Sequence, residues 1–300
     1  MNILITGVTE THVNHPKRAA TTKFASIPEL MRKGFSMLDC DIEHRAVKPG
    51  ENLSMYNKVF VYVYPLDHNA TNHEGAVYAL EKRPDAIVCL DDWSFQKILP
   101  TWQEAIDIRD LTNRAWLAPL FPWGDPKKMN LDVGDIFTWD PSPLYDLPVT
   151  HKLPWINRKH EWYNASLSSD AHLWAKAQQL SWPVHSVGGK KLGQPRLLES
   201  DIVWQYGGYK GVLCPTYSHA GCGWWRVRYL HSAHAGCILG GSPEELGMIH
   251  QSYSYTLEQI EDMDEDVLQT VATLQTENLF KTHATEQQTL DRLRYLLKCS

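Results

Sequence analysis

The chain has 300 residues, of which 43% are hydrophobic and 21% charged, a composition ordinary for a globular protein and a length that favours two domains over one. Its apolar runs are far shorter than the roughly 20 residues of a membrane-spanning helix and no signal-peptide pattern opens it, so we expect neither membrane insertion nor secretion. The net charge is −6, yet residues 258–266 (EQIEDMDED) carry six acids and no base. The rest is therefore neutral, and a phosphate-bearing partner is neither required nor excluded.

The six cysteines form no CxxC pair, and Cys89 and Cys214 lie inside apolar runs that predict buried positions. A disulfide framework is not expected in a chain of this length, which predicts a reducing, cytoplasmic setting.

Strand and helix signals alternate over the first hundred residues. Apolar or alternating runs predict strands at 2–7, 40–47, 58–66 and 85–92. Helical spacing predicts a helix from Phe24 to Lys33, which Pro28 must kink or restart, and a second helix over 73–83 behind a capping box at 71–74. A further helix is predicted behind a cap at 101–104. This rhythm indicates a parallel sheet covered by helices.

The composition of the sequence changes at residues 117–160, which are rich in proline and tryptophan. This segment predicts a connection between lobes, with a boundary near 145–160. Alternation then resumes, with strands at 162–167, 183–189 and 210–217, helices at 168–180 and 195–208, and a loop, helix and strand over 221–241. Helix signals fill the last 45 residues, after a start at 242–245.

The sequence therefore predicts an α/β protein of two doubly wound, Rossmann-like lobes facing across a cleft, residues 1–150 and residues 151–300 with the terminal helices. Ligands of such sheets bind beyond the carboxyl ends of the strands. Small residues and cations in those loops of the second lobe are typical of an anion site, although each cation taken alone could be solvated surface. The candidates are Gly189, Lys190, Lys191, Arg196, Gly223, Arg226 and Arg228.

Two carboxylates, Asp91 and Asp92, end the strand at 85–92. One could act as a general base, or Asp92 could simply cap the next helix. GxGxxG and GxxxxGK[ST] motifs are both absent, and the pair His231 and His234 has no third ligand, so a zinc site is not expected.

The order of elements resembles glycosyltransferases of the GT-B architecture, and within them the phage DNA β-glucosyltransferases, which glucosylate hydroxymethylcytosine. The likeness rests on three segments, YNKVFVYVYPLDHN through AIVCLDDW, WYNASLSSDAHLWAKAQQL, and WWRVR before AHAGCILGG. It implies that Asp92 is the catalytic aspartate and that Ser166 and Arg226 contact a diphosphate. The family's ribose-binding glutamate is missing, and Tyr229 or Leu230 stands at its place.

The resemblance implies an inverting transfer of a sugar from a nucleotide sugar, expected to be a UDP-sugar, to a hydroxyl on a hydroxymethylated base of double-stranded DNA. Asp92 would deprotonate the acceptor, and Trp224 and Trp225 would stack on the donor or pack between lobes. A basic segment would meet acceptor phosphates, with His12, His15, Lys17, Arg18 and Lys23 as candidates. No cofactor is required, a divalent cation is left open, and a monomer is expected.

Three alternatives remain at this stage. The acceptor could be a lipid, a protein or a small molecule in place of DNA. The chain could be a non-catalytic nucleotide-sugar or nucleic-acid binding module, which the missing glutamate favours. It could also be another two-lobed enzyme, such as a nucleotide-sugar epimerase.

Overall fold

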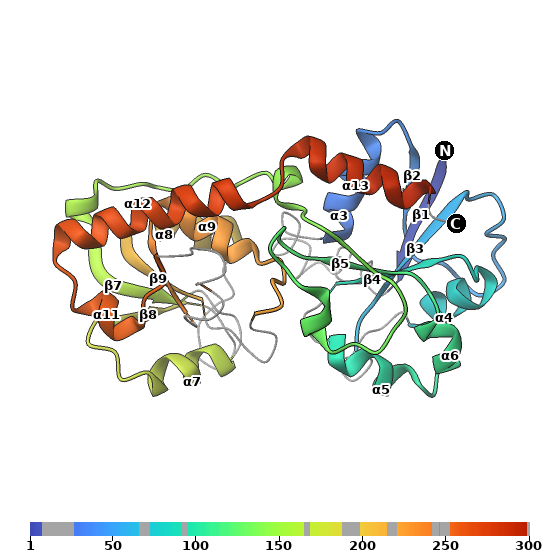
Figure 1. The fold of residues 1–300 in the computed structure, drawn as a ribbon, viewed down its shortest axis with the longest axis horizontal. Helices are drawn as coiled ribbons and strands as arrows, with labels where there is room; N and C mark the ends of the chain where they lie inside the picture. The colour runs from blue at the N-terminus through green and yellow to red at the C-terminus, as the bar shows by residue number, and fades with distance from the viewer. Residues whose placement is uncertain are drawn as a thin grey trace. The chain divides into compact units, whose positions relative to one another are not determined.

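A computed structural model describes residues 1–7, 27–65, 73–91, 95–164, 169–187, 199–214, 221–241, 246 and 253–298. The chain divides into two compact units, residues 1–145 with 284–300 (unit 1) and residues 146–283 (unit 2). Figure 1 shows the elements of each unit as ribbons. No helix of the described ranges has the length and apolar character needed to cross a membrane.

Unit 1 is built on a six-stranded, all-parallel sheet in the order β2-β1-β3-β4-β5-β6. The strands are β1 (Asn2–Gly7), β2 (Asp41–His44), β3 (Lys58–Val63), β4 (Ile87–Leu90), β5 (Trp116–Pro119) and β6 (Ile136–Trp139). The runs at β1, β3, β4 and β5 are almost completely buried, as expected for strands that helices cover on both faces. The four strands predicted in the first hundred residues are thereby confirmed.

Helices α3 (Ile27–Ser36) and α13 (Glu286–Lys298) lie on one side of this sheet and α4 (His73–Lys82) on the other (Figure 1). Pro28 stands in the first turn of α3, where a missing N–H costs nothing, so the helix starts there instead of kinking. The helix continues past Gly34 to Ser36, and the missing side chain of this glycine leaves room for a residue of α13. A Cβ there would lie 2.3 Å from the Cδ1 atom of Leu293 on α13.

Three sequence predictions for unit 1 are corrected by the structure. Residues 116–139 are not a connection between lobes, since they form β5 and β6. Residues 284–300 pack on unit 1 instead of the second lobe, and Thr289 on α13 donates from its hydroxyl to the carbonyl oxygen of Asp140 at 2.9 Å. Thr101 caps no helix, because it lies in the last turn of α5 (Ile98–Trp102), and α6 (Ile108–Thr112) is capped by Asp107.

Unit 2 contains a four-stranded parallel sheet in the order β10-β9-β7-β8, formed by β7 (Lys159–Asn164), β8 (Val184–Ser186), β9 (Tyr209–Cys214) and β10 (Ile238–Gly241). In both sheets the first strand of the unit lies between the second and the third. Such a reversal of winding is where doubly wound sheets bind their ligands. The doubly wound α/β class predicted from the sequence is confirmed.

Trp162 and Tyr163 are consecutive on β7 and therefore point to opposite faces of the unit 2 sheet. On one face Trp162 fills space left by Gly211 and Gly240, where an added Cβ would come within 2.4 and 2.7 Å of the indole ring. It packs there with residues of α7 (Ser169–Ala177), α11 (Leu257–Glu261) and α12 (Glu265–Thr282). On the other face Tyr163 meets Tyr206 of α8 (Glu199–Tyr206) edge to face, with ring centroids 5.2 Å apart.

Two remaining sequence features of unit 2 have structural explanations. In α7, Leu173 is 62% exposed and Ala175 is buried, so the predicted apolar face is rotated. The acidic run 258–266 supplies helix starts, with Glu258 in the first turn of α11 and Asp264 at the N-cap of α12, where negative charge stabilises the helix dipole. The described cysteines are free thiols, and Cys89 and Cys214 are buried as predicted.

Candidate active site at the carboxyl ends of the strands

The amino terminus of α9 (Val227–Ala235) opens at the carboxyl side of the unit 2 sheet, because α9 follows β9 in a parallel arrangement. Arg226 is its N-cap residue, with an extended backbone (φ −132°, ψ 111°) and no side-chain capping bond. The first N–H groups of this helix are thus not capped by the side chain at its start. Because backbone N–H groups point outward at a helix start, this position favours anions.

The glycine-rich stretch before α9 is compact. Gly221 and Gly223 have φ values of +83° and +80°, in the left-handed region that glycine adopts without strain. Cys222 is fully buried between them, and Trp224 and Trp225 are each 4% exposed. The two tryptophans therefore pack into the protein, so their flat faces are not open surface. The turn positions Arg226 at the helix start.

Arg228 is half-buried in the first turn of α9, close to buried groups of unit 2. Burial raises the pKa of Tyr206, and the positive charge of Arg228 partly offsets this. Burial, followed by the positive charge of Arg228, lowers the pKa of His231 from 6.5 to about 3. His231 is therefore a neutral core histidine with 3% exposure.

Tyr229, one of the two residues expected at the place of the family's ribose-binding glutamate, is fully buried. It lines a narrow packing gap that has no room for a water molecule, and the other residues around this gap are Ser232, Ala233, Cys237, Leu239, Gln275 and Thr276. Its side chain therefore offers no surface to a ligand in this structure. A contact between Tyr229 and a donor stays a prediction.

Asn164 ends β7, where the winding of the unit 2 sheet reverses. It is 1% exposed, and its side-chain amide donates to the hydroxyl of Ser186 at the end of β8, over 3.4 Å. This pair ties together the carboxyl ends of the two strands from which the predicted donor loops leave. Those loops hold Ser166, Gly189, Lys190, Lys191 and Arg196, which lie outside the described residues.

Asp91 follows β4 at the carboxyl edge of the unit 1 sheet and is half-buried. Its charge acts on the core next to it, since it raises the pKa values of Tyr62 and Cys89, which burial already raises strongly. Asp92 lies outside the described residues, as do His12, His15, Lys17, Arg18 and Lys23.

Around Asp91 the strand ends are held tightly. Gly7 at the end of β1 has a φ of +116°, and a Cβ there would lie 2.1 Å from the carbonyl oxygen of Tyr62. The indole N–H of Trp102 donates to the carbonyl oxygen of Tyr64 at 2.8 Å and fixes the chain just after β3. The edge beside Asp91 is thus a rigid platform, which suits a group that must hold one geometry.

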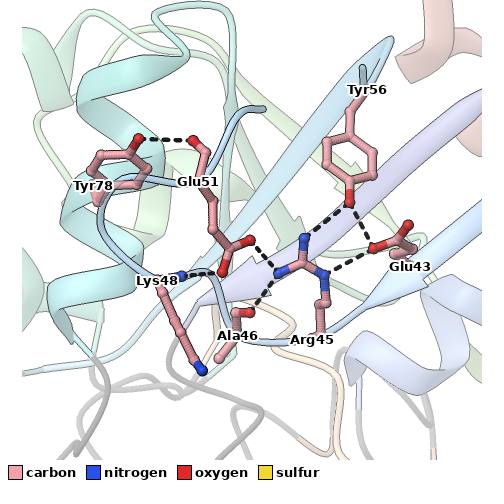
Figure 2. Close-up of polar contacts among 7 residues, drawn as sticks. All are labelled: Glu43, Arg45, Ala46, Lys48, Glu51, Tyr56 and Tyr78. Atoms are coloured by element: carbon pink, nitrogen blue, oxygen red, sulfur yellow. Dashed lines mark hydrogen bonds and ion pairs between the residues drawn. The ribbon is translucent and has the colours of Figure 1, made fainter. Parts of the chain in front are cut away.

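Just after β2, Arg45 donates hydrogen bonds to several neighbouring groups, which together form a network (Figure 2). Its guanidinium donates to Glu43 at 2.8 Å, to Glu51 at 2.6 Å and to the Tyr56 hydroxyl oxygen at 3.1 Å. The Tyr56 hydroxyl in turn donates to Glu43 at 2.6 Å. The hydrogen bond from Tyr56, followed by that from Arg45, holds the pKa of Glu43 below its ordinary value. The network fastens the segment after β2, and we assign it a structural role.

Sequence reasoning missed the loop after β5, residues 120–130, which we call the β5 loop. Its letters, LFPWGDPKKMN, were interpreted as a connection between lobes. In the structure this loop begins at the carboxyl end of β5, and Asp91 follows the carboxyl end of β4. The two strands are parallel neighbours, so both segments leave the same edge of the sheet. The signal that could have found it is the apolar run WLAP directly before it, a strand of only four residues.

The fold defines the class of protein. Two parallel, doubly wound sheets joined in one chain are the architecture of GT-B glycosyltransferases, and the resemblance expected from the sequence is confirmed at the level of the fold. No protein-family model matches the sequence, and no curated protein matches it either.

Particular solved structures are similar over the whole chain. The T4 phage β-glucosyltransferase solved with UDP-glucose has 12% sequence identity, with 99% of each chain covered and a TM-score of 0.65. The same T4 phage enzyme with UDP and Mn²⁺ has 11% identity, 99% coverage of each chain and a TM-score of 0.63. An α-glucosyltransferase solved with UDP and a 13-mer DNA containing an HMU base has 8% identity, 99% coverage of each chain and a TM-score of 0.56.

Proposed function

We propose that this protein is a glycosyltransferase that moves a sugar from a UDP-sugar to a hydroxyl group. The observation that carries the proposal is the likeness in fold over 99% of both chains to an enzyme solved with UDP-glucose. The two sheets and their windings fit a donor site and an acceptor site on separate units.

On the donor side, the diphosphate of the UDP-sugar would lie at the start of α9. The start of a helix favours negative charge, and Arg226 and Arg228 add guanidinium groups that pair with phosphate oxygens in two-bond geometry. Ser166, Gly189, Lys190 and Arg196 would complete this site from neighbouring loops, with Gly223 giving the turn.

On the acceptor side, an aspartate at the end of β4 would take the proton of the attacking hydroxyl, with Asp92 as the first candidate and Asp91 as the second. The arginines would hold the leaving diphosphate as its charge develops. We infer that the acceptor is a hydroxymethylated base in double-stranded DNA, supported by the α-glucosyltransferase solved with a 13-mer DNA containing an HMU base. The base would leave the stack to reach the aspartate.

A metal ion accompanies UDP in one T4 phage structure. Within the described ranges, no group of three or more His, Cys, Asp or Glu side chains could hold one. A protein cage for a metal is thus not provided by those residues, and the arginines take the role of neutralising the diphosphate in our proposal.

The test is transfer of glucose from UDP-glucose to double-stranded DNA with and without hydroxymethylcytosine, followed by release of UDP and mass change of the DNA. We expect transfer only to the modified DNA. The double variant Arg226→Ala/Arg228→Ala should bind UDP at least about 10²-fold more weakly in calorimetry, since each charge-assisted bond contributes about 1.5–3 kcal/mol. UDP affinity that the double variant leaves unchanged would remove the donor site from α9. Absence of UDP-glucose binding by the wild type would remove the proposed function.

A further inference from the structure

The β5 loop presents two lysines on a short, well-anchored turn. Lys127 and Lys128 lie in a 3₁₀ turn (Pro126–Met129) and are both exposed. Neither forms an ion pair or side-chain hydrogen bond with another described residue. Most other basic side chains among the described residues of unit 1 have partners, as Arg45, Arg83 and Arg114 do. Two adjacent, uncompensated cations on a fixed turn are typical of a surface that meets phosphate.

Capping at both ends fixes the backbone under these lysines. The Asp125 carboxylate accepts from the N–H of Lys127 at 3.0 Å and closes the start of the turn. Asn130 ends it in the left-handed region (φ 51°). Asp125 is thereby occupied as a cap.

Each half of the loop is anchored by a buried side chain. The Phe121 and Trp123 rings stack at 5.5 Å with an interplanar angle of 11°, and Phe121 is 2% exposed, so the first half of the loop is tied to the core. In the second half Met129 is fully buried, and its carbonyl oxygen accepts from the Gln96 side chain at 3.4 Å. Gln96 belongs to the 3₁₀ turn Phe95–Lys97 that comes shortly after Asp91. The lysine pair is therefore held beside the segment that follows the candidate catalytic aspartates.

We propose that Lys127 and Lys128 bind the phosphodiester backbone of the acceptor DNA, a site separate from the donor diphosphate. The inference rests on the proposed function and names which surface of unit 1 holds its acceptor. Lysine ammonium groups act as point charges that pair with single phosphates without reading sequence. A flipped base needs its flanking phosphates fixed, and a lysine pair beside the segment that follows the aspartates supplies that anchor.

The test is the salt dependence of DNA binding, measured by fluorescence anisotropy with labelled double-stranded DNA containing hydroxymethylcytosine. The variant Lys127→Ala/Lys128→Ala should lower the slope of log affinity against log salt by about 0.9 for each lost contact. The control variant Lys82→Ala/Arg109→Ala removes two exposed charges at the ends of α4 and α6, at the opposite, amino edge of the same sheet, and should leave the slope unchanged. Thermal melting of both variants checks that they fold equally.

The outcomes separate this inference from the proposed function. UDP-glucose binding should be unchanged in the lysine variant, because the donor site is on unit 2. Wild-type transfer to DNA together with equal slopes for the two double variants would overturn the inference and leave the proposed function standing. A wild type that binds UDP-glucose but does not bind DNA would overturn the inference and remove DNA as the acceptor. If the lysine variant loses affinity for phosphatidylglycerol vesicles but keeps its DNA slope, the loop meets a membrane surface and the inference is likewise wrong.

Discussion

The Arg45 network and the β5 loop use positive charge in opposite ways in one sheet. Arg45 donates hydrogen bonds to two carboxylates and a tyrosine hydroxyl, and these bonds hold the chain segment after β2 (Figure 2). In the β5 loop the capping carboxylate Asp125 accepts from the backbone, and Lys127 and Lys128 stay exposed. The comparison teaches that a carboxylate near a basic residue in the sequence does not show whether that basic side chain is structural or open to a ligand. Its partners in space separate a structural cation from one available to a ligand.

Replacing the candidate catalytic aspartate should give the largest effect and should leave stability unchanged. Asp92→Asn keeps the shape of the side chain but removes the base, so sugar transfer should fall about 10²- to 10⁴-fold while UDP-glucose binding and the melting temperature hold. Asp91→Asn is the paired control and should cost less. A reversed order would exchange the two roles, and full activity in both variants would remove the end of β4 as the catalytic centre.

Breaking the Arg45 network should have the opposite effect. It should lower the stability of the fold and leave the salt dependence of DNA affinity unchanged. Arg45→Ala removes several charge-assisted hydrogen bonds from a side chain that is 36% exposed. We expect the free energy of unfolding to fall by about 1–3 kcal/mol in urea titrations. Arg45→Lys keeps the positive charge but loses the planar set of guanidinium donors. Its free energy of unfolding should lie between those of the wild type and Arg45→Ala. A change in DNA salt slope without a loss of stability would show that Arg45 is a ligand-binding cation and that the contrast with the β5 loop is wrong.

A smaller effect is expected in the pH dependence of stability, from the pair Glu29 and His44. Glu29 of α3 accepts from His44 Nδ1 of β2 at 2.7 Å, and this hydrogen bond is the main cause that lowers the pKa of Glu29 from 4.5 to about 2, against the opposing effect of burial. Since the folded pKa lies below the unfolded one, its stabilisation is complete above pH 4.5 and is lost as the pH falls toward 2. With Glu29 partly exposed, we expect about 1–2 kcal/mol.

The measurement is urea unfolding of the wild type and Glu29→Gln between those two pH values. The variant should be less stable at the upper end and should converge with the wild type at the lower end. Glu104→Gln changes an exposed glutamate and serves as the matched control. Parallel curves for wild type and Glu29→Gln would contradict a stabilising role for the pair.

Local patterns were sufficient for most of the elements. The continuous apolar run at β3 and the glycine-bounded runs at β1 and β9 predict buried parallel strands, because only such strands are apolar on both faces. The alternation of these strands with helices predicts the doubly wound class. Among the candidate site residues, the sequence found Arg226 and Arg228 at the start of a helix and Asp91 at the end of a strand, since position relative to a strand end is a local property.

Other features were decided only by the tertiary structure, because they depend on contacts between residues far apart in the chain. The return of α13 to unit 1 depends on the fit of Leu293 over Gly34, two residues with no local relation in the sequence. Burial of Tyr229 and His231 depends on the elements that close over α9. The sequence alone determined two parallel α/β sheets with charged groups at their strand ends. The folded chain decided which of those charges are consumed by partners, as Arg45 is, and which stay exposed, as Lys127 and Lys128 do.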